Sequence, residues 1–453
     1  MQVKETVSEG LKRELHVVVG VAEINERLSA RLNDMKDRVQ LKGFRRGKVP
    51  MAHIKKVYGK AVMAEVLEEA VKETSAKAIE ERQERPAFQP QIVFPEDKAA
   101  VDKVIEGEAD LAYSMSFEVL PKFEIADFST LKLERLTAEV ADAEVDEALQ
   151  QLLANNVAYE EDAARAAETG DQVKIDFVGK VDGEPFDGGS AEGVDLVLGK
   201  GQFIPGFEEQ LAGLKAGDER QIAVTFPEAY GAAHLAGKPA TFDIKVASVS
   251  APKAQEASDE FAATLGVESL DKLRELLRER IAGEFAQASR VKLKRDLLDA
   301  LDAAHSFDLP SSLVDREFQQ IWGQLERNLK QENKTFADEG KSEEETREEY
   351  KRIAARRVRL GLLIGEIGDK NKIEVSQDEL RRSLLEQVRR FPGQERMVYE
   401  YFEKTPGAIA ELRAPIFEEK VVDFILEQAA PVTKPVSKEE LIAAARGAED
   451  GTP

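Results

Sequence analysis

The feature that most constrains the fold is a change in glycine content and in the periodicity of apolar residues at Gly170. Glycines and short strand-like runs dominate from there to Val249, whereas the chain from Ser258 onward shows mainly helical periodicity. Strand-like runs of this length bounded by glycines are typical of a compact β-rich domain. Because sheet-forming and helix-forming stretches occupy separate blocks, we expect separate domains, and 453 residues suffice for about three.

The block before this change mixes both kinds of periodicity. Apolar residues alternate with others over residues 15–21 and again over 113–119, as in half-buried strands. Residues 51–84 lie between these runs, are rich in Ala, Glu and Lys, and are expected to be helical. Residues 1–120 are therefore predicted to form an α+β domain.

The block after residue 258 carries several helix signals. Apolar residues recur at a spacing of three and four over residues 270–285, and Pro310 stands where a further helix would begin. Ser376 with Glu379 has the spacing of a capping box. Phe391-Pro392-Gly393 is expected to end the helix that this box starts.

Together these patterns predict a multidomain protein of the α+β class. The expected segments are an α+β domain at 1–120, a helical connector at 121–149, a β-rich domain at 150–249, an elongated all-α domain at 250–432, and a disordered tail at 433–453.

Composition excludes several classes of function. The chain has no cysteine, so disulfides, thiol catalysis and zinc–thiolate sites are ruled out. The first residues lack the apolar core of a secretory signal, and no apolar run approaches a membrane span. We therefore expect a cytoplasmic protein without membrane contact. The net charge of −23 means that any contact with RNA requires a local basic patch.

Such a patch lies between Arg38 and Lys60. This stretch holds eight basic residues and no acidic one. At its centre, two glycines and a proline in the run from Gly43 to Pro50 predict a loop. A solvated basic loop is the ordinary interpretation. The alternative is a docking loop, in which Arg and Lys contact RNA phosphates and an exposed Phe enters an apolar protein groove.

The same run resembles the ribosome-binding signature of bacterial trigger factors, with Arg46 at a position where lysine is common. The resemblance implies docking beside the exit tunnel of the large ribosomal subunit, on a ribosomal protein and adjacent rRNA. It also implies nascent and unfolded polypeptides as partners, and it leaves a homodimer off the ribosome open. The residues implied in ribosome binding are Gly43, Phe44, Arg45, Arg46, Gly47, Lys48 and Pro50.

The glycine-rich block contains an ordered series of glycines and aromatics. The series includes Phe186-Asp187-Gly188-Gly189, Gly199-Lys200-Gly201-Gln202-Phe203-Ile204-Pro205-Gly206-Phe207 and Phe226-Pro227-Glu228-Ala229-Tyr230-Gly231. Neither a phosphate-binding loop nor a dinucleotide fingerprint fits its glycine spacing. The series resembles the FKBP family of peptidyl-prolyl isomerases. That resemblance implies a bent antiparallel sheet wrapped on a short helix and a pocket built from Phe177, Phe186, Asp187, Val194, Phe203, Ile204, Phe207, Tyr230 and Phe242.

Isomerisation of an X-Pro bond needs no nucleophile, metal or cofactor. The barrier of about 18–20 kcal/mol belongs to rotation of a planar amide, and an apolar pocket disfavours the charge-separated planar form. Tyr230 is the candidate donor to a substrate carbonyl, whereas Asp187 has either a rim role or a structural role in its turn. Ordinary core packing is the alternative for the phenylalanines, and Phe226 is the candidate for pure core. Phe207 and Val194 depart from the residues common in FKBPs.

The helical remainder leaves two interpretations open. Its apolar residues either line a groove for unfolded chains or form the buried seam of a helical bundle. These residues are Phe318, Ile321, Trp322, Leu325, Leu360, Leu362, Leu363, Ile364, Met397, Tyr399 and Phe402. Resemblance to the trigger factor carboxy-terminal domain favours the first and implies that residues 250–432 form two arms around a cradle. The whole chain is thus expected to be a ribosome-associated chaperone with isomerase activity. A free isomerase and a periplasmic chaperone-isomerase are the alternatives.

Overall fold

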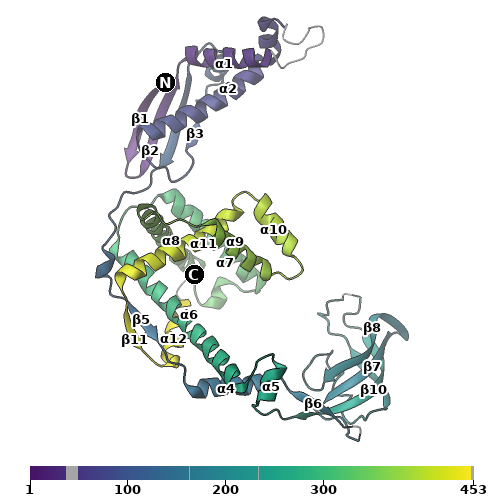
Figure 1. Cartoon of the computed structure of the whole chain (residues 1–453). Coiled ribbons are helices and arrows are strands. Elements are labelled where there is room, and N and C mark those ends of the chain that lie inside the picture. The colour runs from purple at the N-terminus through teal and green to yellow at the C-terminus, as the bar shows by residue number, and fades with distance from the viewer. Residues whose placement is uncertain (37–48, 163, 233, 450–453) are drawn as a thin grey trace. The chain divides into compact units, whose positions relative to one another are not determined.

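The computed structural model describes residues 1–36, 49–162, 164–232 and 234–449. Two compact units make up the chain (Figure 1). The first contains residues 1–136, 289–434 and the chain from 443 onward, and the second contains residues 137–288 and 435–442. The β-rich segment is thus inserted, in sequence, between parts of the first unit.

The first unit begins with a four-stranded antiparallel sheet in the order β1-β2-β4-β3. Its strands are β1 (Gln2–Glu9), β2 (Lys12–Val19), β3 (Gln91–Val93) and β4 (Leu111–Glu118). Every second residue is buried from Leu15 to Val19 of β2 and throughout β4, as the period of a strand requires. The alternation in the sequence therefore predicted both central strands.

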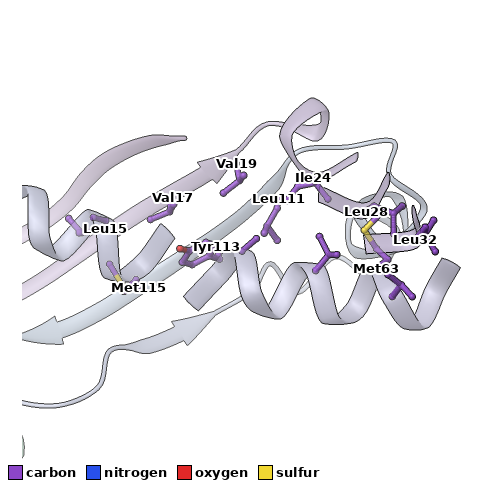
Figure 2. Packing of buried hydrophobic residues seen from close by; sticks show 14 of the residues in the cluster. Leu15, Val17, Val19, Ile24, Leu28, Leu32, Met63, Leu111, Tyr113 and Met115 are labelled. Carbon is purple, nitrogen blue, oxygen red and sulfur yellow. The ribbon is translucent and has the colours of Figure 1, made fainter. Parts of the chain in front are cut away.

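Helices α1 (Val21–Lys36) and α2 (Met51–Glu81) complete this core, and the shorter α3 (Lys98–Glu106) follows β3. Figure 2 shows side chains of β2 and β4 meeting Ile24, Leu28 and Met63 of the two long helices. Tyr113 is fully buried at its centre, and its hydroxyl lies 2.8 Å from Thr74 Oγ1. A buried hydroxyl with a partner avoids the cost of an unsatisfied polar group.

A connector and a set of helices follow the sheet domain. These elements are η1 (Phe128–Thr130), β5 (Glu134–Thr137), α6 (Leu270–Ala304), α7 (Ser311–Gln331), η2 (Phe336–Glu339), α8 (Glu343–Lys370), α9 (Gln377–Arg389), α10 (Glu395–Lys404) and α11 (Ala408–Ala429). Leu297 of α6, Leu363 of α8 and Ile425 of α11 are fully buried in one shared core. None of the helices in the described ranges combines the length and apolar character needed to cross a membrane.

The helix boundaries follow the local signals in the sequence. Pro310 immediately precedes α7, and Ser376 caps α9. In the capping box, Glu379 Oε2 accepts from Ser376 N at 2.8 Å, and Ser376 Oγ accepts from Glu379 N at 3.3 Å. The break at residues 391–393 separates α9 from α10.

The carboxy-terminal segment differs from the prediction. The sequence predicts a disordered tail from residue 433, but the chain forms strand β11 (Val432–Pro435) and helix α12 (Lys438–Glu449). Strand β11 pairs with β5, and Leu441 of α12 is fully buried. The segment is ordered because it completes a two-stranded sheet and buries an apolar side chain, so the disorder prediction is wrong for residues 433–449.

The second unit contains the β-rich segment. Its elements are α4 (Asp142–Asn155), β6 (Ala158–Glu161), β7 (Gln172–Val181), β8 (Glu184–Val197), β9 (Glu219–Thr225), β10 (Pro239–Lys253) and α5 (Asp259–Thr264), with the first part of α6. The antiparallel sheet has the order β6-β10-β7-β8, and β9 also pairs with β10. Residues with inward side chains, among them Ile175, Leu196 and Phe207, form a separate core.

Candidate functional site

A cluster of aromatic rings lies at one end of the core of the second unit. Phe177 of β7 lies edge-on to Phe203, Phe207 and Phe242, with ring centroids 5.7–6.2 Å apart. Phe203 stacks on Phe207 at 4.7 Å, and Phe186 of β8 lies edge-on to Phe242 at 6.1 Å. These separations fall in the favourable range for aromatic pairs. The structure therefore brings all five predicted phenylalanines together.

The members of this cluster differ in exposure. Phe207 is fully buried and forms the floor, whereas Phe177, Phe186 and Phe203 are half-buried and leave ring surface for a ligand. Ile204 is also half-buried beside this core. The floor is thus core, as the ordinary interpretation requires, while the walls remain accessible.

Tyr230 stands at the edge of the cluster. Its side chain is 39% exposed, and its ring lies 4.8 Å from Phe226. Within the described ranges, its hydroxyl forms no hydrogen bond and can donate to a ligand. Phe226 is buried as predicted and joins Tyr230 to the cluster, since it also contacts Phe186 at 5.8 Å.

Two predicted rim residues are less well defined. Asp187 is exposed, and no polar contact of its carboxylate occurs among the described residues. Its role stays a prediction. Val194 is half-buried against the same core as the rings.

Glycines at two strand positions make room for the rings, which the sequence analysis did not foresee. A methyl group on Gly179 would come within 2.5 Å of the Phe242 ring and 2.8 Å of the Phe186 ring. One on Gly189 would meet the Phe186 ring at 2.7 Å. Such distances are far below van der Waals contact, so Phe186 occupies a slot that only glycine leaves open. In the sequence, a glycine inside a predicted strand is the feature that could have indicated this close approach of a ring to the backbone.

Glu208 is a second residue that the sequence analysis missed. Its buried carboxylate accepts four backbone N–H groups of the loop that precedes Ile204. The donors are Gly199 at 2.8 Å, Gly201 at 3.0 Å, Gln202 at 2.6 Å and Phe203 at 3.2 Å. Burial alone would raise the pKa of this carboxyl, but the four donors together lower it below its usual value. Glu208 therefore holds the loop that carries one wall of the ring cluster.

The short helix implied by the resemblance is replaced by successive turns over residues 205–213. The backbone hydrogen bonds of these turns join residues three apart, for example Leu211 N to Glu208 O at 3.1 Å. Gly206 and Gly213 have φ values of +85° and +86°, which a regular helix does not allow. Phe207 reaches the floor from this run of turns.

Of the candidate ribosome-binding residues, Gly43, Phe44, Arg45, Arg46, Gly47 and Lys48 lie outside the described residues. Pro50 is described and precedes α2 with extended backbone. Lys55, Lys56 and Lys60 are exposed along the first turns of α2, which carry no acidic residue. This part of α2 continues the basic patch.

The candidate client-binding residues of the helical part divide by exposure. Most are core: Phe318 and Trp322 are buried in a small cluster, and Leu363 is fully buried in the main one. Met397 and Tyr399 of α10 are 61% and 41% exposed. The bundle interpretation is therefore correct for the first group, and α10 keeps an accessible apolar surface.

The ring cluster and its sheet define the class of protein. The family model of FKBP-type peptidyl-prolyl cis-trans isomerases matches residues 163–247 of the sequence, which contain every residue of the cluster. The molecule is a multidomain protein that carries an isomerase domain of this type.

Comparisons with whole proteins identify the family. The models of the bacterial trigger factor protein and of its carboxy terminus match residues 1–152 and 269–427. The trigger factor of Parvibaculum lavamentivorans is 54% identical over 445 residues, covering 98% of this chain and 86% of that protein. That of Xanthobacter autotrophicus is 52% identical over 441 residues, covering 97% and 98%. The chain belongs to the trigger factor family and is a folding chaperone with peptidyl-prolyl isomerase activity.

A solved structure supports the fold. It comes from work on promiscuous substrate recognition in the folding and assembly activities of the trigger factor chaperone. It is 20% identical in sequence, has a TM-score of 0.58, and the match covers 95% of this chain and 100% of that one.

Proposed function

We propose that this chaperone docks on the large ribosomal subunit beside the exit tunnel and receives nascent polypeptides there, in the cytoplasm. The observation that carries the proposal is the basic patch between Arg38 and Lys60 in a chain of net charge −23. A free isomerase has no need of such a patch. Phosphate contacts from Arg and Lys supply most of the affinity of a protein for RNA.

Within the patch, Phe44 is the proposed contact to a ribosomal protein, and Arg45 and Arg46 are the proposed contacts to rRNA. Gly43 and Gly47 shape the loop, Lys48 adds charge, and Pro50 sets the start of α2. The exposed lysines of α2 support the proposal because they extend the cationic surface along a rigid helix.

Division of labour among the segments is the second part of the proposal. Residues 1–120 bind the ribosome, residues 150–249 isomerise X-Pro bonds, and residues 121–149 with 250–432 hold clients. The exposed apolar side chains of α10 support a client surface in the last segment. Off the ribosome, the same surfaces would be free to associate with a second copy.

In the isomerase site, we assign the walls and floor of the pocket to the five clustered phenylalanines and Ile204. The apolar surroundings favour the twisted amide over the charge-separated planar one, and Tyr230 donates to the substrate carbonyl. Asp187 orients polar groups of the substrate at the rim. No group in this scheme changes its protonation state during the reaction.

Ribosome docking is tested by co-sedimentation with ribosomes at rising salt. Phe44→Ala/Arg45→Ala/Arg46→Ala should abolish pelleting, and the remaining affinity should fall with salt as phosphate contacts require. The chain offers a matched control, Arg389→Ala/Arg390→Ala/Phe391→Ala, which removes the same side chains from exposed positions. If the first triple variant pellets like the control, the proposed docking loop is wrong.

The role of Tyr230 is tested with Tyr230→Phe in a protease-coupled proline-peptide assay. Loss of one hydrogen bond worth ~1 kcal/mol predicts a rate several-fold lower, because the ring and the pocket remain. Tyr159→Phe, on strand β6, is the control. An unchanged rate in Tyr230→Phe would remove the hydroxyl from the mechanism and leave the rings.

A further inference from the structure

Helix α3 is capped at both ends but buries none of its side chains. Asp97 accepts from Ala99 N at 3.0 Å at its start, and Gly107 closes its end with φ +75°. Its apolar residues Val101 and Val104 are nevertheless only half-buried. An amphipathic helix usually turns its apolar stripe toward the core, so the half-buried stripe of α3 leaves apolar surface available for further contacts.

A cavity of about 520 Å³ lies beneath this stripe. Leu67 and Val71 of α2, Ile92 and Phe94 at β3, and Val101 and Val104 of α3 line it. Phe94 is 49% exposed at its edge, and the neighbouring Val93 is 52% exposed. Pockets that hold ligands span about 300–1,000 Å³ and have mainly apolar walls, so the cavity has room for several apolar side chains.

Two acidic residues, Glu68 and Asp110, line this apolar cavity. The two segments that supply its walls, residues 64–71 and 91–112, contain nine acidic and two basic residues. Glu68 lines the opening, is exposed, and has no ion-pair partner among the described residues. Asp110 also lines it, and its carboxylate accepts from Val21 N at 2.7 Å. Glu65 of the same segment pairs with Arg31 at 3.8 Å, but acidic residues still outnumber basic ones in the two segments, so the rim attracts cations.

We infer that this groove between α2, α3 and β3 binds apolar segments of unfolded polypeptides that carry Lys or Arg. The apolar floor takes the aliphatic or aromatic side chains, and the acidic rim takes the cationic ones. The groove is thus a client site in the sheet domain, separate from the isomerase pocket and from α10. The inference rests on the chaperone function, since a chaperone presents such surfaces to unfolded chains.

The charge of the rim selects this occupant over others. Outside the stretch from Arg38 to Lys60, a second copy of this strongly acidic chain would bring mainly like charge to the rim. An uncharged apolar ligand would make no use of it. A segment with both apolar and basic side chains satisfies floor and rim together.

The test places a photo-crosslinking phenylalanine analogue in the full chain, at Phe94 or, separately, at Tyr399 of α10. Phe94 reports on the groove, and Tyr399 on the helical part. The probes are a fluorescent peptide of Leu, Phe and Lys and the same peptide with Glu in place of Lys. Each is mixed with wild type, Glu68→Lys, or the control Glu9→Lys, which makes the same charge change at an exposed position on β1. Circular dichroism checks that each variant is folded.

The basic peptide should crosslink at position 94 and the acidic one much less. Glu68→Lys should lower capture there roughly 30-fold, since an attraction of ~1 kcal/mol at ~4 Å in water becomes a repulsion of the same size, a change of ~2 kcal/mol. Capture at position 399 should stay unchanged, and Glu9→Lys should affect neither position.

Three results would overturn the inference. One is failure of the basic peptide to crosslink at 94 while its capture at 399 proceeds, which would leave the chaperone function intact. Another is an equal loss at both positions in Glu68→Lys. The third is crosslinking of a second copy at 94 without added peptide, which would make the groove an interface between copies.

Discussion

Replacing Glu208 should loosen one wall of the proposed isomerase pocket without touching any ring. Each of its carboxylate oxygens accepts two backbone N–H groups: Oε2 those of Gly199 and Gly201, Oε1 those of Gln202 and Phe203. Glu208→Gln keeps one acceptor oxygen and turns the other into a donor. Two N–H groups of the loop then face an N–H₂ group instead of an oxygen.

The expected cost follows from these contacts. A hydrogen bond to a charged group contributes roughly 1.5–3 kcal/mol, so losing two would remove 3 kcal/mol or more in a sealed site. Gly201 and Gln202 are exposed, however, and water can replace part of the lost bonding. We therefore expect ~2–3 kcal/mol, a factor of ~30–150 in the opening equilibrium of the loop.

The assay is hydrogen exchange of the full chain, read on peptides that cover residues 199–204, together with isomerisation of a proline peptide. Exchange of this loop should speed up by about the factor above, while peptides of β7 change little. The ratio kcat/KM should fall at least ~10-fold, because Phe203 and Ile204 lose their fixed positions, and displacements near 1 Å can cost ~100-fold.

Glu209→Gln is the matched control, since Glu209 is adjacent, exposed and loses the same charge. If Glu208→Gln exchanges and isomerises like this control, the carboxylate does not hold the loop. The pH dependence gives a further check. The folded pKa of Glu208 lies below its unfolded value, so its stabilisation is complete above about pH 4.5 and is lost as pH falls through the folded pKa. In acid, the loop of the wild-type chain should therefore exchange at a rate closer to that of Glu208→Gln.

Two other substitutions test the packing and the helix caps. Gly179→Ala forces a methyl group into the Phe242 ring and should cut isomerase activity at least several-fold, whereas Gly283→Ala, where the added carbon meets nothing, should not. Glu379→Gln should lower the thermal midpoint of the full chain at pH 7, measured by circular dichroism. The Ser376 N–H is the main cause that lowers the pKa of the Glu379 carboxyl to about 2, so this difference should shrink as pH falls from about 4.5 toward 2.

Local patterns predicted the elements well. Alternation over residues 15–21 and 113–119 indicated β2 and β4, and the capping box at Ser376 marked the start of α9, because each depends only on neighbours in sequence. The phenylalanines of the ring cluster were found through an ordered motif. Strand periodicity puts Phe177 and Phe242 on one face, whereas Phe207 joins them from a run of turns.

The features that the sequence analysis did not predict depend on contacts between residues that are distant in the chain. The slot of Phe186 requires Gly179 on another strand, and a glycine in a strand looks the same whether or not a ring lies over it. The segment after residue 432 is short and polar, so its own sequence does not indicate order. Its strand is ordered by pairing with β5, which lies far away in the chain. The division of the helical apolar residues into core and surface likewise needed the packing.

The pairing of β11 with β5 has a consequence for synthesis of this protein. Lys434 forms an ion pair with Glu134, and the two residues lie 300 positions apart. At translation rates of about 5–20 residues per second, β5 waits roughly 15–60 s for its partner. During that interval its unpaired edge is open to any extended chain nearby. A protein that protects other chains as they emerge is therefore itself incomplete until nearly its last residues have been made.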